Sequence, residues 1–134
     1  MSRAQKAKEY FLQGYACSQA VALAFADLLP VEREHLEKLA LPFGGGLGRQ
    51  RLTCGAVSGM AIVLGLLKAD SGCATENKTN TYAQTKEICE QFEREHGSLI
   101  CAELLEKRKH LDHKLSCGDI VYQATEILEK YLNE

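Results

Sequence analysis

Cysteine is the residue type of this 134-residue chain with the most distinctive chemistry. Six cysteines are present, at Cys17, Cys54, Cys73, Cys89, Cys101 and Cys117. No two of them are separated by only two residues, so the chain lacks the CxxC pairs of zinc ribbons and thioredoxin-like sites. Any site that these thiols share must therefore be assembled by the fold.

The composition is that of an ordinary globular protein. Hydrophobic residues make up 46% and charged residues 25%, and a chain of this length forms a single domain, here residues 1–134. The N-terminal segment MSRAQKAKEYFLQG lacks the uninterrupted apolar run of a secretory signal, so we expect a cytoplasmic protein. Thiols stay reduced there, which favours metal, cluster or thiol redox chemistry over structural disulfides.

Charge and hydropathy exclude two classes of partner. The formal net charge of -2 offers no broad attraction to nucleic acid. The longest weakly polar run, Leu52 to Leu67, is shorter than the roughly 18–20 residues that span a bilayer, so it predicts a buried core helix and no membrane span. Its apolar surface would also suit a homo-oligomer.

The elements that must position the cysteines are predicted to be helices. Apolar residues recur at helical spacing and no strand alternation persists, which predicts an all-α fold, a compact bundle of about six to seven helices. The segment FGGGLGRQRLT, with four glycines, is predicted to be a loop. The expected helices run from Arg3 to Gln13, Ala16 to Leu29, Val31 to Ala40, Cys54 to Lys68, Lys78 to His96, Leu99 to Lys109 and Cys117 to Leu132.

Four cysteines fall at the starts of these helices. Cys17 and Cys54 open the second and fourth, Cys101 lies in the first turn of the sixth, and Cys117 opens the seventh. Unpaired N–H groups and a partial positive charge at a helix start favour the thiolate, so we expect cysteine pKa values below the usual value of about 8.5. A thiolate is the form that attacks disulfides and ligates metals.

Three polar residues are predicted to cap helices that carry these cysteines. Thr53 precedes Cys54, Ser98 precedes the sixth helix, and Ser116 with Asp119 forms a capping box in the segment SCGD. The carboxylate of Asp119 would oppose a thiolate nearby, because like charges repel.

At these positions the chain resembles a known family. The segments GYACSQAV, FGGGLGRQRLTCGAVSG, HGSLICAELL and KLSCGDIVYQATEIL are similar to the redox-active proteins named for the pattern C_GCAxxG_C_C. The family's CGAxxG element matches Cys54, Gly55, Ala56 and Gly59. The resemblance implies that one redox site is formed by the four signature cysteines, Cys17, Cys54, Cys101 and Cys117, and leaves Cys73 and Cys89 outside it.

Three chemistries could use such a site. Four thiolates could hold a metal or an iron–sulfur cluster, most simply [2Fe–2S], for electron transfer or sensing, and helix N-termini would stabilise its negative charge. Two cysteines could cycle between dithiol and disulfide in an oxidoreductase, with Cys54 attacking because neighbouring glycines expose its sulfur. A structural zinc site with four cysteines is the third, although such sites usually contain CxxC pairs.

We rank a metal or cluster site ahead of thiol exchange. The alternative without a site is that all six cysteines simply fill space in a helical core, as free cysteine commonly does. This is the interpretation that we prefer for Cys89, in the middle of a helix, and for Cys73, in a polar turn. A redox partner is implied, and no motif in the sequence identifies it.

The remaining polar residues give weaker predictions. Gly45 and Arg49 lie in the glycine segment, which we expect to form a rim over Cys54, with Arg49 or Arg51 near a thiolate or an anionic substrate. This segment lacks the Lys-Ser/Thr ending of a phosphate-binding P-loop. The histidines are predicted to lie on solvated surfaces, at His35, His96, His110 and His113.

The small residues after Cys54 predict a close helix contact. Gly55 and Gly59 are four apart and share one helix face, which permits a close backbone approach. With Ala56, they would let neighbouring helices bring their own cysteines to Cys54.

Overall fold

The computed structural model describes residues 1–110 and 116–134, and it is built from α-helices. The described residues form seven helices of seven or more residues, which confirms the all-α prediction. Shorter turns are η1 (Ala26–Leu28), η2 (Leu41–Phe43) and α4 (Gly44–Leu47). The longer helices are α1 (Arg3–Gln13), α2 (Cys17–Leu23), α3 (Arg33–Ala40), α5 (Gly55–Lys68), α6 (Thr75–His96), α7 (Cys101–Arg108) and α8 (Cys117–Leu132).

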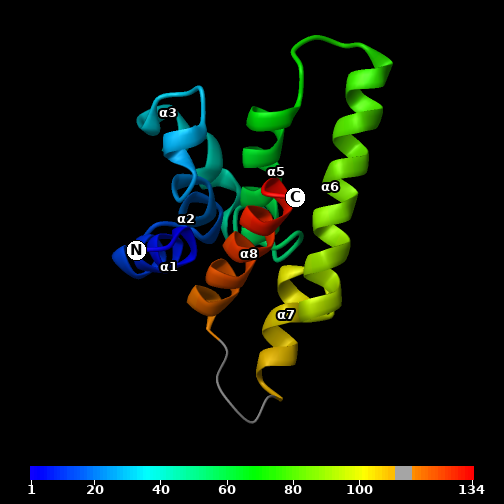
Figure 1. The fold of residues 1–134 in the computed structure, drawn as a ribbon. Helices are drawn as coiled ribbons and strands as arrows, with labels where there is room; N and C mark the ends of the chain where they lie inside the picture. The colour runs from blue at the N-terminus through cyan, green and yellow to red at the C-terminus, as the bar shows by residue number, and fades with distance from the viewer. Residues whose placement is uncertain (111–115) are drawn as a thin grey trace.

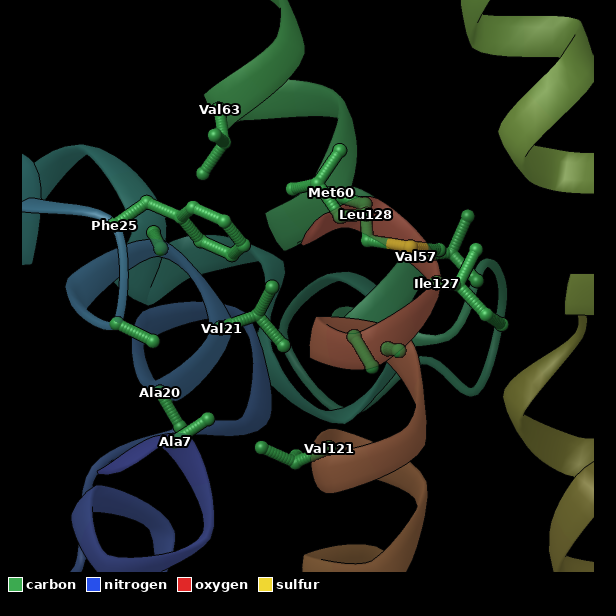
Figure 2. Close-up of a cluster of buried hydrophobic side chains, with 14 of the residues drawn as sticks. Ala7, Ala20, Val21, Phe25, Val57, Met60, Val63, Val121, Ile127 and Leu128 are labelled. Atoms are coloured by element: carbon green, nitrogen blue, oxygen red, sulfur yellow. The ribbon is translucent and has the colours of Figure 1, made fainter. Parts of the chain in front are cut away.

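Helices α2, α5 and α8 supply the centre of the bundle. Helix α2 packs along α5, α1 packs along α8, and the long helix α6 lies on the outside against α5 and α8 (Figure 1). The close-up in Figure 2 shows that apolar side chains of α2, α5 and α8 meet. Phe25, Met60 and Leu128 are fully buried there. Burying side chains of this size stabilises the fold by about 1.5–3 kcal/mol each.

The expected second helix is shorter than predicted. Helix α2 ends at Leu23, and the chain continues through the short turn η1. Pro30 explains why no helix reaches Leu29, since its ring would clash with a helical carbonyl four residues earlier and it drives the preceding residue to an extended conformation. Leu29 is indeed extended, with ψ of 141°.

The glycine segment is a structured turn and not a plain loop. Gly45 and Gly46 have positive φ angles of 65° and 73°, which glycine adopts without strain. Arg51 shares this left-handed conformation at φ 64°, which costs a residue with a side chain about 1–2 kcal/mol. Hydrogen bonds from the N–H groups of Arg51 and Leu52 to Gly45 O and Gly46 O, at 3.1 and 3.0 Å, hold the turn together.

One of the three predicted caps is present. Ser116 Oγ accepts from Asp119 N at 3.1 Å, and Asp119 Oδ2 accepts from Ser116 N at 2.9 Å, which confirms the capping box of α8. The predictions for Thr53 and Ser98 are wrong, because α5 and α7 take Cys54 and Ile100 as N-caps. Thr53 pairs with Ile100 in an antiparallel β-bridge instead.

The prediction of a solvated His96 is also wrong. Its side chain is only 5% exposed and stacks on Phe92, one turn earlier on the buried face of α6, with ring centroids 4.4 Å apart. His96 Nε2 finds no hydrogen-bond partner among the described residues. His35 and His110 are exposed as expected, and His113 lies outside the described residues.

Burial of His96 should make the protein less stable in mild acid. Burial lowers the pKa of His96 below its usual 6.5, against a smaller upward effect of Glu95, and the charge of Lys107 lowers it further. The unfolded chain therefore binds more protons than the folded one at acidic pH, so stability is full above about pH 6.5 and falls as the pH drops below it. Urea unfolding between pH 5 and 8 measures this loss.

His96→Phe is the variant that isolates this contribution. Phenylalanine keeps the stacking on Phe92 and has no ring nitrogen to protonate. The free energy of unfolding of this variant should therefore fall less in mild acid than that of the wild type. His35→Phe, at an exposed position, serves as the control and should keep the wild-type pH profile. An unchanged profile for His96→Phe would assign the acid sensitivity to other groups.

No helix in the described parts of the chain is both long and apolar enough to cross a membrane.

Candidate functional site

One small cavity is lined by all four cysteines that stand at helix starts. Its volume is about 60 Å³. The structure therefore brings together Cys17, Cys54, Cys101 and Cys117, which lie up to 100 residues apart in the sequence. The cavity is completed by Gly45, Arg51, Gly55, Leu104, Leu105, Arg108 and Ile120.

A short backbone pairing joins the starts of α5 and α7. Cys54 N donates to Leu99 O at 2.8 Å, and Cys101 N donates to Leu52 O at 2.6 Å, on the two sides of the bridge between Thr53 and Ile100. Because these bonds involve the backbone of both cysteines, they fix where the two helices begin relative to each other. Cys54 and Cys101 are thereby held at one end of the bundle.

Missing side chains on α5 let α2 approach and deliver Cys17. A Cβ atom on Gly55 would collide with Cys17 Sγ. A Cβ atom on Gly59 would lie 2.8 Å from Ser18 O and 2.9 Å from Val21 Cβ, closer than real contacts permit. The close helix contact expected at Gly55 and Gly59 is therefore present, and Ala56 beside them is fully buried.

Two arginines contact sulfur atoms of this cavity. Arg108 Nη1 donates a hydrogen bond to Cys117 Sγ at 2.8 Å, from the last turn of α7 to the first residue of α8. Arg51 Nη1 lies 3.7 Å from Cys101 Sγ, a longer contact. A guanidinium close to sulfur complements a negative charge on that sulfur.

The carboxylate of Asp119 is occupied elsewhere. It accepts from Ser116 N and from Lys8 Nζ, the latter at 2.9 Å, and these partners lower the pKa of Asp119 to about 2. Asp119 is therefore charged at neutral pH, and its charge is compensated by Lys8 and by the start of α8. This arrangement reduces the repulsion that we expected between Asp119 and a thiolate at Cys117.

The buried cysteines have raised pKa values, contrary to the expectation for a helix start. Burial raises the pKa of Cys54 to about 12, and the nearby Cys17 adds to the rise, although the N–H groups of Ala56 and Val57 act against it. Burial likewise raises the pKa of Cys17, against the opposing N–H of Gly45. Desolvation outweighs the helix terminus at both positions. Cys54 is also only 7% exposed, so the glycines beside it do not open its sulfur to solvent.

The other predicted residues lie outside the cavity. Cys73 is exposed, and Cys89 is half-buried against the core, where burial and then Glu93 raise its pKa. Arg49 is exposed, and its side chain lies over Gly45, whose Cβ position would be 2.7 Å from Arg49 Cγ. Sequence reasoning missed Arg108, because its nine-residue separation from Cys117 has no helical or strand periodicity that marks them as neighbours.

The four cysteines around the cavity are a candidate set of metal ligands. Thiolates are suitable ligands for zinc and for iron–sulfur clusters. Among residues 1–110 and 116–134, however, no group of three or more His, Cys, Asp or Glu side chains has the spacing needed to hold a metal ion. The donor type therefore fits such a group, and the arrangement of the sulfurs in this structure does not.

Comparison with known proteins identifies the family. The family model described as "Putative redox-active protein (C_GCAxxG_C_C)" matches residues 15–131, which is most of the chain and includes all four cysteines of the cavity. Neither the curated proteins nor the solved structures gave a match. On the strength of the family model, the chain belongs to the C_GCAxxG_C_C family of redox-active proteins.

Proposed function

We propose that the protein is a thiol–disulfide oxidoreductase in which Cys117 is the attacking sulfur. The observation that carries the proposal is the 2.8 Å hydrogen bond from Arg108 to Cys117 Sγ. Thiol–disulfide exchange requires a thiolate, and cysteines beside arginine are among those that react fastest. Cys117 is also less deeply buried than Cys54.

The exchange proceeds in two steps. The Cys117 thiolate attacks one sulfur of a substrate disulfide, a mixed disulfide forms, and the first substrate thiolate leaves. A second cysteine thiolate then attacks Cys117 Sγ, forms a protein disulfide and releases the second substrate thiolate. Two electrons pass from the two cysteines to the substrate, and a dithiol reductant restores the protein.

Cys17 is the resolving cysteine in this proposal. It lines the same cavity as Cys117, which places its sulfur on the side of the site where the mixed disulfide forms. Its raised pKa keeps Cys17 a neutral thiol until the mixed disulfide forms. Its proton can then pass to the departing substrate thiolate.

The proposal moves the attacking role away from Cys54, where the sequence suggested it. With a pKa of about 12, Cys54 has roughly one thiolate in 10⁵ molecules at pH 7. We propose that Cys54 remains a neutral buried thiol beside Cys17. We also propose that the protein works in a reducing compartment such as the cytoplasm, where its cysteines return to thiols between turnovers.

A bound metal or [2Fe–2S] cluster is the second candidate. It is supported by the presence of four cysteines on one cavity, together with two arginines that would complement the negative charge of a cluster. It requires the four sulfurs to converge further than they do here. A structural zinc ion would have the same requirement.

One preparation separates these candidates. Protein purified without oxygen is analysed for iron, sulfide and zinc and by visible absorption, and is then reduced and mixed with 2-hydroxyethyl disulfide. We expect a colourless, metal-free protein that gains one disulfide, located between Cys17 and Cys117 by peptide mapping. Matching iron and sulfide with visible absorbance would support the cluster instead. One zinc ion per protein chain, with none of the four cavity cysteines titratable as a free thiol, would support the structural zinc site.

A further inference from the structure

The charged residues around the cysteine cavity are all of one sign. Among its described lining residues, Arg51 and Arg108 are the charged side chains, and the rest are cysteines, glycines and apolar residues. No described carboxylate lies within ion-pair distance of either guanidinium. Two such cations at the edge of an apolar cavity attract an anion to it.

Arg51 is held at this edge by its backbone. Its carbonyl accepts from Ala102 N at 3.2 Å, and its N–H donates to Gly45 O at 3.1 Å. The left-handed φ of 64° is unfavourable for arginine, and such conformations persist where surrounding contacts enforce them, often at functional sites. The side chain nevertheless remains exposed, so its remaining donors can reach a molecule arriving from solvent.

The size of the cavity limits what can enter it. The cavity is small, about 60 Å³, so a compact group fits against the four cysteines better than a bulky one does. A small anion with a terminal sulfur could place that sulfur between the cysteines. Its charged oxygens would then face the two guanidinium groups.

We propose that the preferred substrates are small oxyanions that carry a terminal sulfur bonded to another sulfur, of which thiosulfate is the simplest. This inference rests on the proposed thiol–disulfide function and names its substrate class. Arg51 and Arg108 bind the oxygens, and the terminal sulfur lies against Cys117.

The reaction balances without another reactant. The Cys117 thiolate attacks the terminal sulfur, a persulfide S–S bond forms on Cys117, and the S–S bond of thiosulfate breaks with sulfite as the leaving group. The Cys17 thiolate then attacks Cys117 Sγ, forms the protein disulfide and releases hydrosulfide. Two thiolates, thiosulfate and one proton thus give a disulfide, hydrosulfide and sulfite.

The test compares a charged and a neutral substrate in a single turnover. Reduced protein is mixed without oxygen with thiosulfate, and sulfite and sulfide are measured. The same preparation is mixed with 2-hydroxyethyl disulfide, and loss of thiols is measured. We expect equal amounts of sulfite, sulfide and protein disulfide from thiosulfate, with competition by sulfate.

Arg51→Gln is the variant that tests anion binding. It should slow the thiosulfate reaction at least about tenfold more than it slows the reaction with the neutral disulfide, because only thiosulfate loses a charge-assisted contact. Arg49→Gln is a matched control, because Arg49 has the same φ of 64°, lies two residues away and does not line the cavity. It should leave both rates unchanged.

The outcomes separate this inference from the proposed function. A protein that reacts with the neutral disulfide but releases no sulfite, or an Arg51→Gln variant that slows both reactions equally, overturns the substrate class and leaves thiol exchange standing. A protein that forms no Cys17–Cys117 disulfide with either compound overturns the proposed function itself.

Discussion

Cys117→Ser should abolish disulfide formation by the protein and slow its reaction with 2-hydroxyethyl disulfide by at least about 100-fold. Serine keeps the start of α8 and its capping box, but a hydroxyl group cannot form the mixed disulfide. Neither Cys17 nor Cys54 can replace Cys117, because burial raises the pKa values of both thiols. The pKa of Cys54, about 12, leaves it almost never ionised at pH 7. Stopped-flow measurement of free thiols gives the rate.

Three further serine variants make this result specific. Cys17→Ser should still form the mixed disulfide on Cys117 and then stop, since the resolving sulfur is gone. Cys89→Ser and Cys73→Ser should react like the wild type, because neither residue lines the cavity. A normal rate in Cys117→Ser together with a lost rate in Cys101→Ser would transfer the attacking role to Cys101, the sulfur that Arg51 contacts.

The features of the fold and of the site that were predictable are those that depend on local sequence. Gly14 and Gly97, which end α1 and α6, adopt the left-handed conformation that glycine favours, so the ends of these helices could be predicted. The placement of four cysteines at or next to helix starts followed from the same kind of signal. A local pattern contains this information because a helix end is decided by a few neighbouring residues.

Burial and long-range contacts were not predictable in this way. The electrostatic effect of a helix start on Cys54 could be predicted from sequence, but the larger effect of burial depends on how α2, α5 and α7 pack around it. Arg108, in the last turn of α7, reaches Cys117 at the start of α8, and the sequence has no signal for that approach. The prediction of a solvated His96 was wrong because it rested on the charged residues beside it in the sequence, whereas His96 shares a helix face with Phe92.

Gly59→Leu should destabilise the protein by more than about 3 kcal/mol and prevent assembly of the cysteine cavity. Even a single Cβ atom at this position would lie 2.8 Å from Ser18 O, an atom of the α2 backbone that cannot move aside without moving the helix. Gly59→Ala should therefore cost about 1–3 kcal/mol, despite the higher helix propensity of alanine. Urea unfolding measures both changes.

Gly65 provides the control, because it lies in the same helix and a Cβ atom there would have no neighbour within 4 Å. Gly65→Ala should stabilise the protein by about 0.5–1 kcal/mol, since alanine restricts the unfolded chain and favours the helix. The reaction of Cys117 with 2-hydroxyethyl disulfide should persist in Gly65→Ala, whereas in Gly59→Ala the Cys17–Cys117 disulfide should form more slowly as α2 is displaced. Equal stability and equal disulfide formation in the two alanine variants would show that the close approach of α2 to α5 is not what brings Cys17 to the site.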